Sequence, residues 1–173
     1  MPHNPQLNDP ARLRSTAGLP TRRVLVIANQ TATSPALIAE LHRCSAPGLA
    51  DVHLVVPALN TRLSHWLSAT DEAVAAAHRR ADCARAVLMS HGLAVSVEVG
   101  DSVPLLAIED ALAEFDADEI VISTLSPSQS HWLEHDVVEL ARERFDVPVR
   151  HVVGSEDAMG PGPEVGAHLR SAA

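Results

Sequence analysis

Residues 97–123, VEVGDSVPLLAIEDALAEFDADEIVIS, hold in one stretch the pattern that decides the fold. The segment opens with alternating valines, turns at Gly100, resumes at Pro104 with apolar residues at helical spacing, and ends in an apolar run over 119–122. Alternation is typical of a strand, a spacing of three to four residues is typical of a helix, and proline suits the first position of a helix. This stretch therefore predicts a strand, a helix and a second strand.

The same alternation covers the rest of the body of the chain. We expect strands at 24–28, 52–56, 93–99, 119–122 and 147–153, with helices beginning near residues 34, 71, 104 and 131. Strands that alternate with helices pair in parallel through right-handed crossovers. The sequence therefore predicts a three-layer α/β/α fold, with a five-stranded parallel sheet in the flavodoxin-like order 3-2-1-4-5.

Proline and glycine mark the limits of the ordered domain. Both are concentrated at the two ends, so we expect flexible tails at 1–20 and 154–173 around one α/β domain at 21–153. The two cysteines, Cys44 and Cys83, fit no zinc spacing, and we expect both to be buried free thiols.

The overall charge excludes several classes of partner. The net charge is −9, and the thirteen arginines, with no lysine, never form a run longer than two, which argues against nucleic-acid binding.

No apolar segment approaches the roughly 20 residues needed to span a bilayer, so we expect no membrane association. The first residues lack the apolar core of a signal peptide, and we predict a cytoplasmic protein.

The predicted strand order brings the strands at 24–28 and 119–122 together at the switch point of the sheet. Ligands of open α/β sheets bind there, outside the carboxyl ends of the strands. The candidate ligand-binding residues follow these two strands or lie on the flank, at the end of the strand at 52–56: Asn29, Gln30, Thr31, Val55, Val56, Pro57, Ser123, Thr124, Ser126 and Ser130.

Each polar group in this set has two interpretations. The hydroxyl-rich loop at 123–130 either binds an anion or a ribose, or only satisfies its own backbone and caps the next helix. Asn29 either contacts a ligand or forms an Asx-turn that ends its strand. The long connection at 60–66 is either a lid or a packed surface loop.

Residues 131–135, HWLEH, match the inverted zinc-protease pattern H-x-x-E-H. The pattern lies at the start of a short helix that must turn Leu133 and Val137 toward the sheet, and little chain follows to supply a third ligand. We therefore expect a chance match and no metal. No pairing of a nucleophile with a base is visible either, and we predict that the protein is not an enzyme.

Several segments together resemble the universal stress protein family. VLVIANQT at 24–31 resembles its first strand, the segment at 97–123 is similar to its strand–Gly–Pro–helix–strand run, and HDVVELARERFDVPVRHVV at 135–153 resembles its last helix and strand. PALNTRLSHW at 57–66 and ISTLSPSQSHWLE at 122–134 resemble an actinobacterial branch of that family.

This resemblance implies a nucleotide site that the present chain has altered. Nucleotide-binding members carry a Gly-x-x-Gly loop after the fourth strand and a Gly-Ser/Thr pair at the last helix, where backbone N–H groups approach phosphates. Here no glycine lies between Asp101 and Val153, and His135 and Asp136 fall at the Gly-Ser pair. Asn29 stands where the family has Asp, and Glu134 with Asp136 would repel phosphate.

The sequence therefore predicts a regulatory, stress-response module that binds a small uncharged or weakly anionic ligand or a partner, is not a tight ATP binder and needs no cofactor. The alternative is an ATP- or AMP-binding protein with a non-standard phosphate loop and at most slow ATPase activity. A third possibility is an interaction module with no ligand. The resemblance also implies a homodimer through the last strand, Val147 to Val153; the competing arrangement is a monomer whose tail covers that edge.

Overall fold

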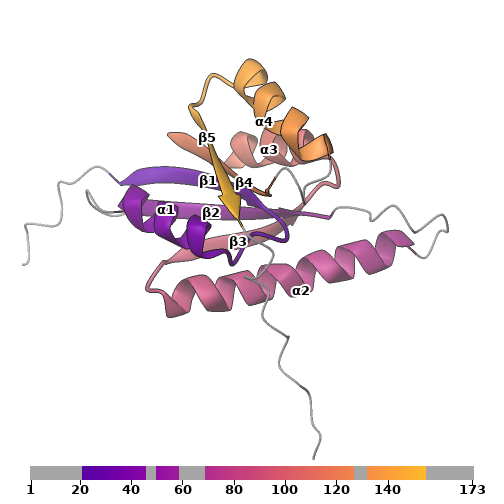
Figure 1. Ribbon diagram of the computed structural model, residues 1–173, viewed down its shortest axis with the longest axis horizontal. Helices are drawn as coiled ribbons and strands as arrows, with labels where there is room; N and C mark the ends of the chain where they lie inside the picture. The colour runs from indigo at the N-terminus through magenta and orange to yellow at the C-terminus, as the bar shows by residue number, and fades with distance from the viewer. Residues whose placement is uncertain (1–20, 46–49, 59–68, 127–131, 155–173) are drawn as a thin grey trace, which may run out of the picture.

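The computed structural model describes residues 21–45, 50–58, 69–126 and 132–154 (Figure 1). Strands and helices alternate through these residues. The strands are β1 (Arg22–Ala28), β2 (Ala50–Pro57), β3 (Val95–Gly100), β4 (Glu119–Leu125) and β5 (Val149–Gly154), and the helices are α1 (Pro35–Ser45), α2 (Ala69–Ser90), α3 (Pro104–Glu114) and α4 (Trp132–Arg144).

The five strands form one parallel sheet in the order β3-β2-β1-β4-β5, which confirms the predicted order. The central strand β1 pairs with β2 on one side and with β4 on the other. The chain leaves β1 for α1 on one face of the sheet and leaves β4 for α4 on the other face, so the carboxyl ends of β1 and β4 border the switch point at which α/β proteins bind ligands.

Helices α1 and α2 cover one face of the sheet, and α3 and α4 cover the other (Figure 1). Each face has its own core, since successive strand residues point to opposite sides. Val24 and Val26 of β1 pack with Leu37 of α1, whereas Leu25 packs with Ile108 of α3. No helix within the described ranges is long and apolar enough to cross a membrane.

Helix boundaries follow local sequence signals. Gly92, at φ +77°, takes the left-handed conformation that commonly ends a helix, directly after α2. Ser34 Oγ accepts a hydrogen bond from the Leu37 backbone N–H at 3.2 Å, which caps α1 ahead of Pro35.

Several local predictions are wrong. Ser123 and Thr124 belong to β4 and not to a loop, because β4 continues as a buried strand to Leu125. The helical spacing from Val137 predicts that Leu140 faces inward, but Leu140 is exposed and Val138 lies in the core instead. Cys83 is exposed, and of the two cysteines only Cys44 is buried.

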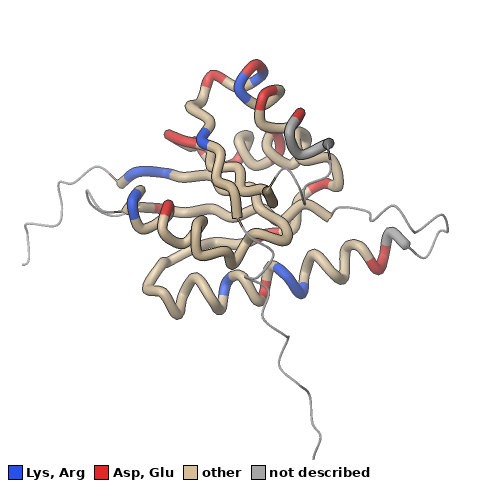
Figure 2. Tube along the Cα trace, in the orientation of Figure 1, with Lys and Arg blue, Asp and Glu red and all other residues tan. Residues whose placement is uncertain are grey.

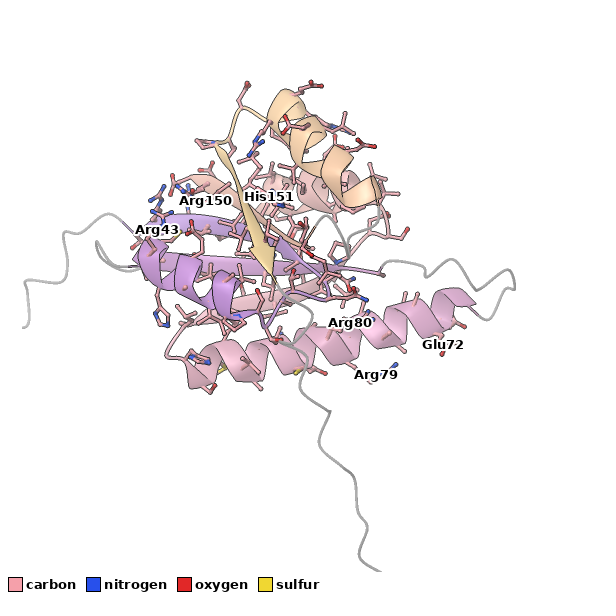
Figure 3. All side chains as sticks on the ribbon, viewed as in Figure 1. Arg43, Glu72, Arg79, Arg80, Arg150 and His151 are labelled. Atoms are coloured by element: carbon pink, nitrogen blue, oxygen red, sulfur yellow. The ribbon has the colours of Figure 1, made fainter. Side chains whose placement is uncertain are left out.

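An ionic cluster closes the amino-terminal end of the sheet. Glu119, 2% exposed, accepts contacts from Arg22 Nη2 and Arg150 Nε, each at 2.7 Å. Arg150 Nε also lies 2.8 Å from Glu40 of α1, which pairs in turn with Arg43. Basic and acidic segments meet at this end of the sheet in Figure 2, and Arg43 and Arg150 lie near each other in Figure 3.

This cluster sets the protonation of two α1 side chains. The hydrogen bond from Arg43 lowers the pKa of Glu40, and the charges of Arg43, Arg150 and Arg22 act in the same direction. Burial raises the pKa of the Cys44 thiol, and the nearby Glu119 carboxylate adds to that effect. Glu40 therefore stays ionised and Cys44 stays a neutral thiol near neutral pH.

Candidate functional site

A small pocket lies at the carboxyl ends of β1 and β4, on the side of the sheet covered by α3 and α4. Its volume is about 40 Å³, so only part of a small molecule can enter it. The lining residues come from the ends of β1, β2 and β4, from the start of α3 and from α4: Ile27, Ala28, Asn29, Pro57, Pro104, Ile122, Ser123, Thr124 and Val137. None of these side chains carries a charge, and most are apolar.

Asn29 forms the polar wall at the end of β1. Its Nδ2 donates to the Pro57 carbonyl at 2.6 Å, which joins the tips of β1 and β2. The carboxamide keeps an acceptor oxygen and a second N–H. Asn29 is therefore a structural tie between β1 and β2 and a neutral polar group on the pocket wall; its bond runs to a neighbouring strand and is not an Asx-turn, and contact with a ligand stays a prediction.

The start of α3 forms a second wall and offers few donors to an anion. Asp101 Oδ1 accepts a hydrogen bond from the Val103 N–H at 2.7 Å, and Pro104, the first helical residue, has no N–H. The Leu106 N–H bonds to the Val103 carbonyl. The N–H groups of a first helical turn are what normally bind phosphate; here no side chain caps that turn, and the Asp101 carboxylate lies beside Val103, the residue that precedes it.

Thr124 supplies the hydroxyl of the pocket and connects it to the edge strand. Its Oγ1 donates to the Leu125 carbonyl at 3.0 Å and lies 2.8 Å from His151 Nε2. A hydroxyl has one hydrogen, so in this arrangement His151 Nε2–H is the donor of the second bond. The imidazole is thereby held against β4 rather than turned to the outer edge of β5.

Thr31 and Ser123 face a compact layer beneath α1. Thr31, 1% exposed, donates through Oγ1 to the Ser123 carbonyl at 2.8 Å. The Ser123 hydroxyl is buried with no hydrogen-bond partner among the described residues. A Cβ at Gly154 would come within 2.9 Å of both Ser34 Oγ and Thr31 Cγ2, so the chain is tightly packed here.

The structure brings together part of the predicted site. Asn29, Pro57, Ser123 and Thr124 line the pocket, as the adjacency of β1 and β4 requires. The other predicted residues are placed elsewhere: Gln30 is exposed, Thr31, Val55 and Val56 are buried in the packed interior, and Ser126 is half-buried outside the pocket lining. Ser130 and the 60–66 connection lie outside the described residues. Ligand contact by any of these residues stays a prediction.

Sequence reasoning missed five residues of the lining: Ile27, Ala28 and Ile122, which lie in the strands just ahead of the predicted residues, and Pro104 and Val137, which come from helices. Pro104 was expected only to start a helix, although a helix that follows β3 must begin at the carboxyl end of the sheet, beside the switch point. Val137 was expected to face the sheet, and it does so at the pocket wall. Topology could therefore have placed Pro104 and Val137.

The described residues contain no group of three or more His, Cys, Asp or Glu side chains that could hold a metal ion. The H-x-x-E-H stretch is not tested by that finding, because His131 and the side chains of 132–135 lie outside the described set.

Comparisons with known proteins identify the fold. Neither a family model nor a curated protein matches the sequence. A universal stress protein structure from Archaeoglobus fulgidus is similar, with 16% identity, a TM-score of 0.52, and coverage of 80% of this chain and 98% of that chain. The Archaeoglobus protein in complex with dAMP gives 16% identity, a TM-score of 0.51, and coverage of 78% and 99%. A universal stress protein family structure from Burkholderia pseudomallei gives 22% identity, a TM-score of 0.48, and coverage of 75% and 93%.

These identities are low, so the likeness concerns architecture. Nearly the whole of the Archaeoglobus chain is matched by the body of this one. The five-stranded parallel sheet in the order β3-β2-β1-β4-β5, with two helices on each face, is therefore the fold found in universal stress proteins.

Proposed function

We propose that this chain is a universal stress protein-like regulatory module of the cytoplasm, without catalysis of its own, that binds a small uncharged or weakly anionic ligand between β1 and β4. The observation that carries the proposal is the chemistry of the pocket: its lining has no charged side chain, and the carboxylate of Asp101 bonds to Val103 immediately ahead of α3. A ligand can pack an apolar edge against Val137 and Ile122 while it bonds to Asn29 or Thr124.

The size and charge of the pocket argue against a triphosphate. A volume of about 40 Å³ holds a small group, and the rest of a larger ligand would remain in the open. Phosphates near Asp101 would meet a carboxylate and a proline where nucleotide sites usually present N–H donors. Repulsion between unit charges is on the order of 1 kcal/mol at 4 Å in water and several-fold larger in a partly buried site.

Native mass spectrometry of protein purified without added ligand tests the proposal. We expect a co-purifying small molecule that lacks a polyphosphate. Val137→Trp, which fills the pocket, should abolish that adduct, whereas Leu140→Trp on the exposed side of the same helix should retain it. An adduct that survives Val137→Trp would place the ligand elsewhere and contradict the proposed site.

A second candidate is binding of a nucleoside monophosphate, with at most slow hydrolysis of ATP. The observation that favours it is the similar Archaeoglobus structure in complex with dAMP. A single phosphate could extend from the shallow pocket toward solvent. Recovery of AMP or dAMP as the native adduct would favour this candidate over an uncharged ligand.

We further propose that β5 pairs with its two-fold copy in a homodimer. At the other edge of the sheet, Arg85 Nη2 from α2 donates to the Val97 carbonyl of β3 at 2.8 Å and so covers part of that edge. On β5, Arg150 is drawn inward to Glu119, and His151 lies against Thr124. Val153 is 45% exposed beside them.

Sedimentation equilibrium of wild type and Val153→Asp tests the dimer. The exposed position of Val153 allows the charge without disturbing the core, whereas Val152 packs against it. We expect a wild-type dimer at micromolar concentration and a monomeric variant. A monomeric wild type would contradict this assembly.

A further inference from the structure

We infer that Ser96 is a site of covalent acylation, at which His53 acts as the base and Glu98 positions the imidazole. The three side chains lie at the β3 edge of the sheet, and none of them lines the pocket. The inference therefore does not depend on the proposed ligand. The acyl donor is an activated ester of a small carboxylic acid. One acyl group is consumed per chain, so the step modifies the protein itself and is not catalytic turnover.

The register of β2 and β3 brings the three residues together, although His53 and Ser96 are 43 positions apart. His53 lies directly opposite Ser96. Glu98 follows Ser96 by two residues, and side chains two positions apart on a strand project from the same face of a sheet. A hydroxyl, an imidazole and a carboxylate therefore share one face of the β2–β3 pair.

Two short contacts place the His53 imidazole between the other two side chains. His53 Nδ1 lies 2.7 Å from Ser96 Oγ, and Nε2 lies 3.0 Å from Glu98 Oε1. When the neutral imidazole carries its hydrogen on Nε2, that N–H donates to Glu98, and Nδ1 accepts the Ser96 hydroxyl. A serine bonded to a base that a third group orients is the arrangement that activates the hydroxyl in acyl transfer. The two ring nitrogens are interchanged relative to Ser-His-Asp enzymes, but each performs the same chemistry.

The Ser96 hydroxyl has a second acceptor, the Val52 carbonyl, at 3.3 Å. A hydroxyl has one hydrogen and so donates to one acceptor at a time. When the imidazole is protonated, Nδ1–H donates to Ser96, and the hydroxyl turns to Val52. When the imidazole is neutral, Nδ1 is the closer acceptor. The neutral imidazole is therefore the form that withdraws the proton from Ser96.

Packing fixes the imidazole and leaves the serine open to solvent. The His53 ring stacks on Phe115, with the ring centroids 5.3 Å apart and the planes at 30°, and its side chain is only 16% exposed. Ser96 is exposed on the edge strand. An acyl donor can therefore reach the hydroxyl directly from solvent, while the base keeps its orientation. Because this approach involves no enclosing cavity, the inferred donor is a small ester held by few contacts.

The acylation step balances without any further reactant. Ser96 Oγ attacks the carbonyl carbon of the ester and forms a new O–C bond, while its proton passes to His53 Nδ1. The bond from that carbon to the leaving oxygen then breaks, and the leaving group keeps the electron pair and takes the proton from Nδ1. Glu98 stabilises the imidazolium that exists between these two events. The products are acyl-Ser96, a free alcohol and a neutral His53.

Acetylation by p-nitrophenyl acetate, mapped by mass spectrometry of peptides, tests the inference. The chain contains no lysine, so the amine that most often competes for such a probe is missing. Ser90 is the internal control, because it is exposed and its hydroxyl donates to the Val87 carbonyl at 2.7 Å and not to a base. We expect Ser96 to be acetylated about 100-fold faster than Ser90, the lower end for a positioned general base. Equal rates at the two serines would overturn the inference.

Variants assign the roles of the two partners. His53→Phe keeps a ring to stack on Phe115 but has no base, and it should slow acetylation of Ser96 to the rate of Ser90. Ser90→Ala is the matched control and should leave the rate at Ser96 unchanged. Acetylation of Ser96 at the wild-type rate in His53→Phe would contradict the role of His53.

Glu98 is 45% exposed, so its variants should fold even if His53→Phe does not. Glu98→Gln removes the charge and should slow acetylation of Ser96 about five-fold, the size of an exposed ion pair. Glu98→Asp restores the charge and should recover part of the rate, which a purely structural effect of the substitution would not do. An unchanged rate in Glu98→Gln would overturn the positioning role of this carboxylate.

Discussion

Arg150 Nε lies 2.7 Å from Glu119 Oε1, so an arginine on the edge strand neutralises a carboxylate that is 2% exposed at the start of β4. Arg22 of β1 approaches the other oxygen of Glu119, also at 2.7 Å. One buried carboxylate therefore joins three neighbouring strands at their amino-terminal ends, opposite the pocket.

Glu119→Gln should lower the free energy of unfolding by about 3 kcal/mol. This value is at the lower end for the loss of one partner of a buried ion pair, because both arginines are partly exposed and water can solvate them in the variant. Glu109→Gln is the matched control: its pair with Arg144 joins two exposed side chains, and its loss should cost less than about 1 kcal/mol. Urea unfolding measures both. Equal losses would mean that Glu119 is not the tie described.

Acid should destabilise the protein through Glu40. Its pKa is lowered in the folded state, chiefly by the hydrogen bond from Arg43, so the folded chain binds fewer protons at this site than the unfolded chain. That contribution is complete above the ordinary value of 4.5 and is lost as the pH falls through the lowered pKa. Thermal unfolding of Glu40→Gln should show a weaker dependence on pH below 4.5 than wild type. An unchanged pH profile would exclude Glu40 as a contributor.

Ser123→Ala should leave stability unchanged or raise it by about 1 kcal/mol, because its hydroxyl is buried without a partner among the described residues. Thr31→Val should instead lower stability by about 1 to 2 kcal/mol, since the buried Ser123 carbonyl loses its donor. Chemical unfolding of the two variants gives the comparison, and a destabilised Ser123→Ala would show that the hydroxyl has a partner.

The two cysteines should differ in reactivity. Cys83 is exposed on α2, whereas Cys44 is buried and its pKa is raised by that burial and by Glu119. Under native conditions a maleimide should label one thiol per chain, and Cys83→Ser should remove that label while Cys44→Ser retains it. Rapid native labelling of Cys44 would contradict the burial of α1 against the sheet.

The fold could be predicted from the sequence because its signals are local. Continuous apolar runs such as 24–28, helix starts such as Pro35 and Pro104, and the cap at Gly92 each report their own element, and strict alternation limits the strand order. Ser123 and Thr124 were misplaced because hydroxyl residues favour loops and strands alike, and only the neighbours β1 and β5 make this segment a strand.

The contacts that join distant residues could not be predicted in this way. Glu119 meets Arg22 and Arg150 across 97 and 31 positions, and no local pattern in the sequence marks a buried carboxylate. Thr124 and His151 are 27 positions apart, and a one-residue shift in register would have turned them to opposite faces.

Isothermal titration calorimetry with Mg-ATP, compared with adenosine as an uncharged probe, tests the central claim most directly. The uncharged pocket and the Asp101 carboxylate just ahead of α3 predict that the wild-type protein does not bind Mg-ATP in the low-micromolar range. The variant Asp101→Asn should bring the affinity for Mg-ATP closer to the affinity for adenosine. A low-micromolar dissociation constant for Mg-ATP with the wild-type protein would contradict the account.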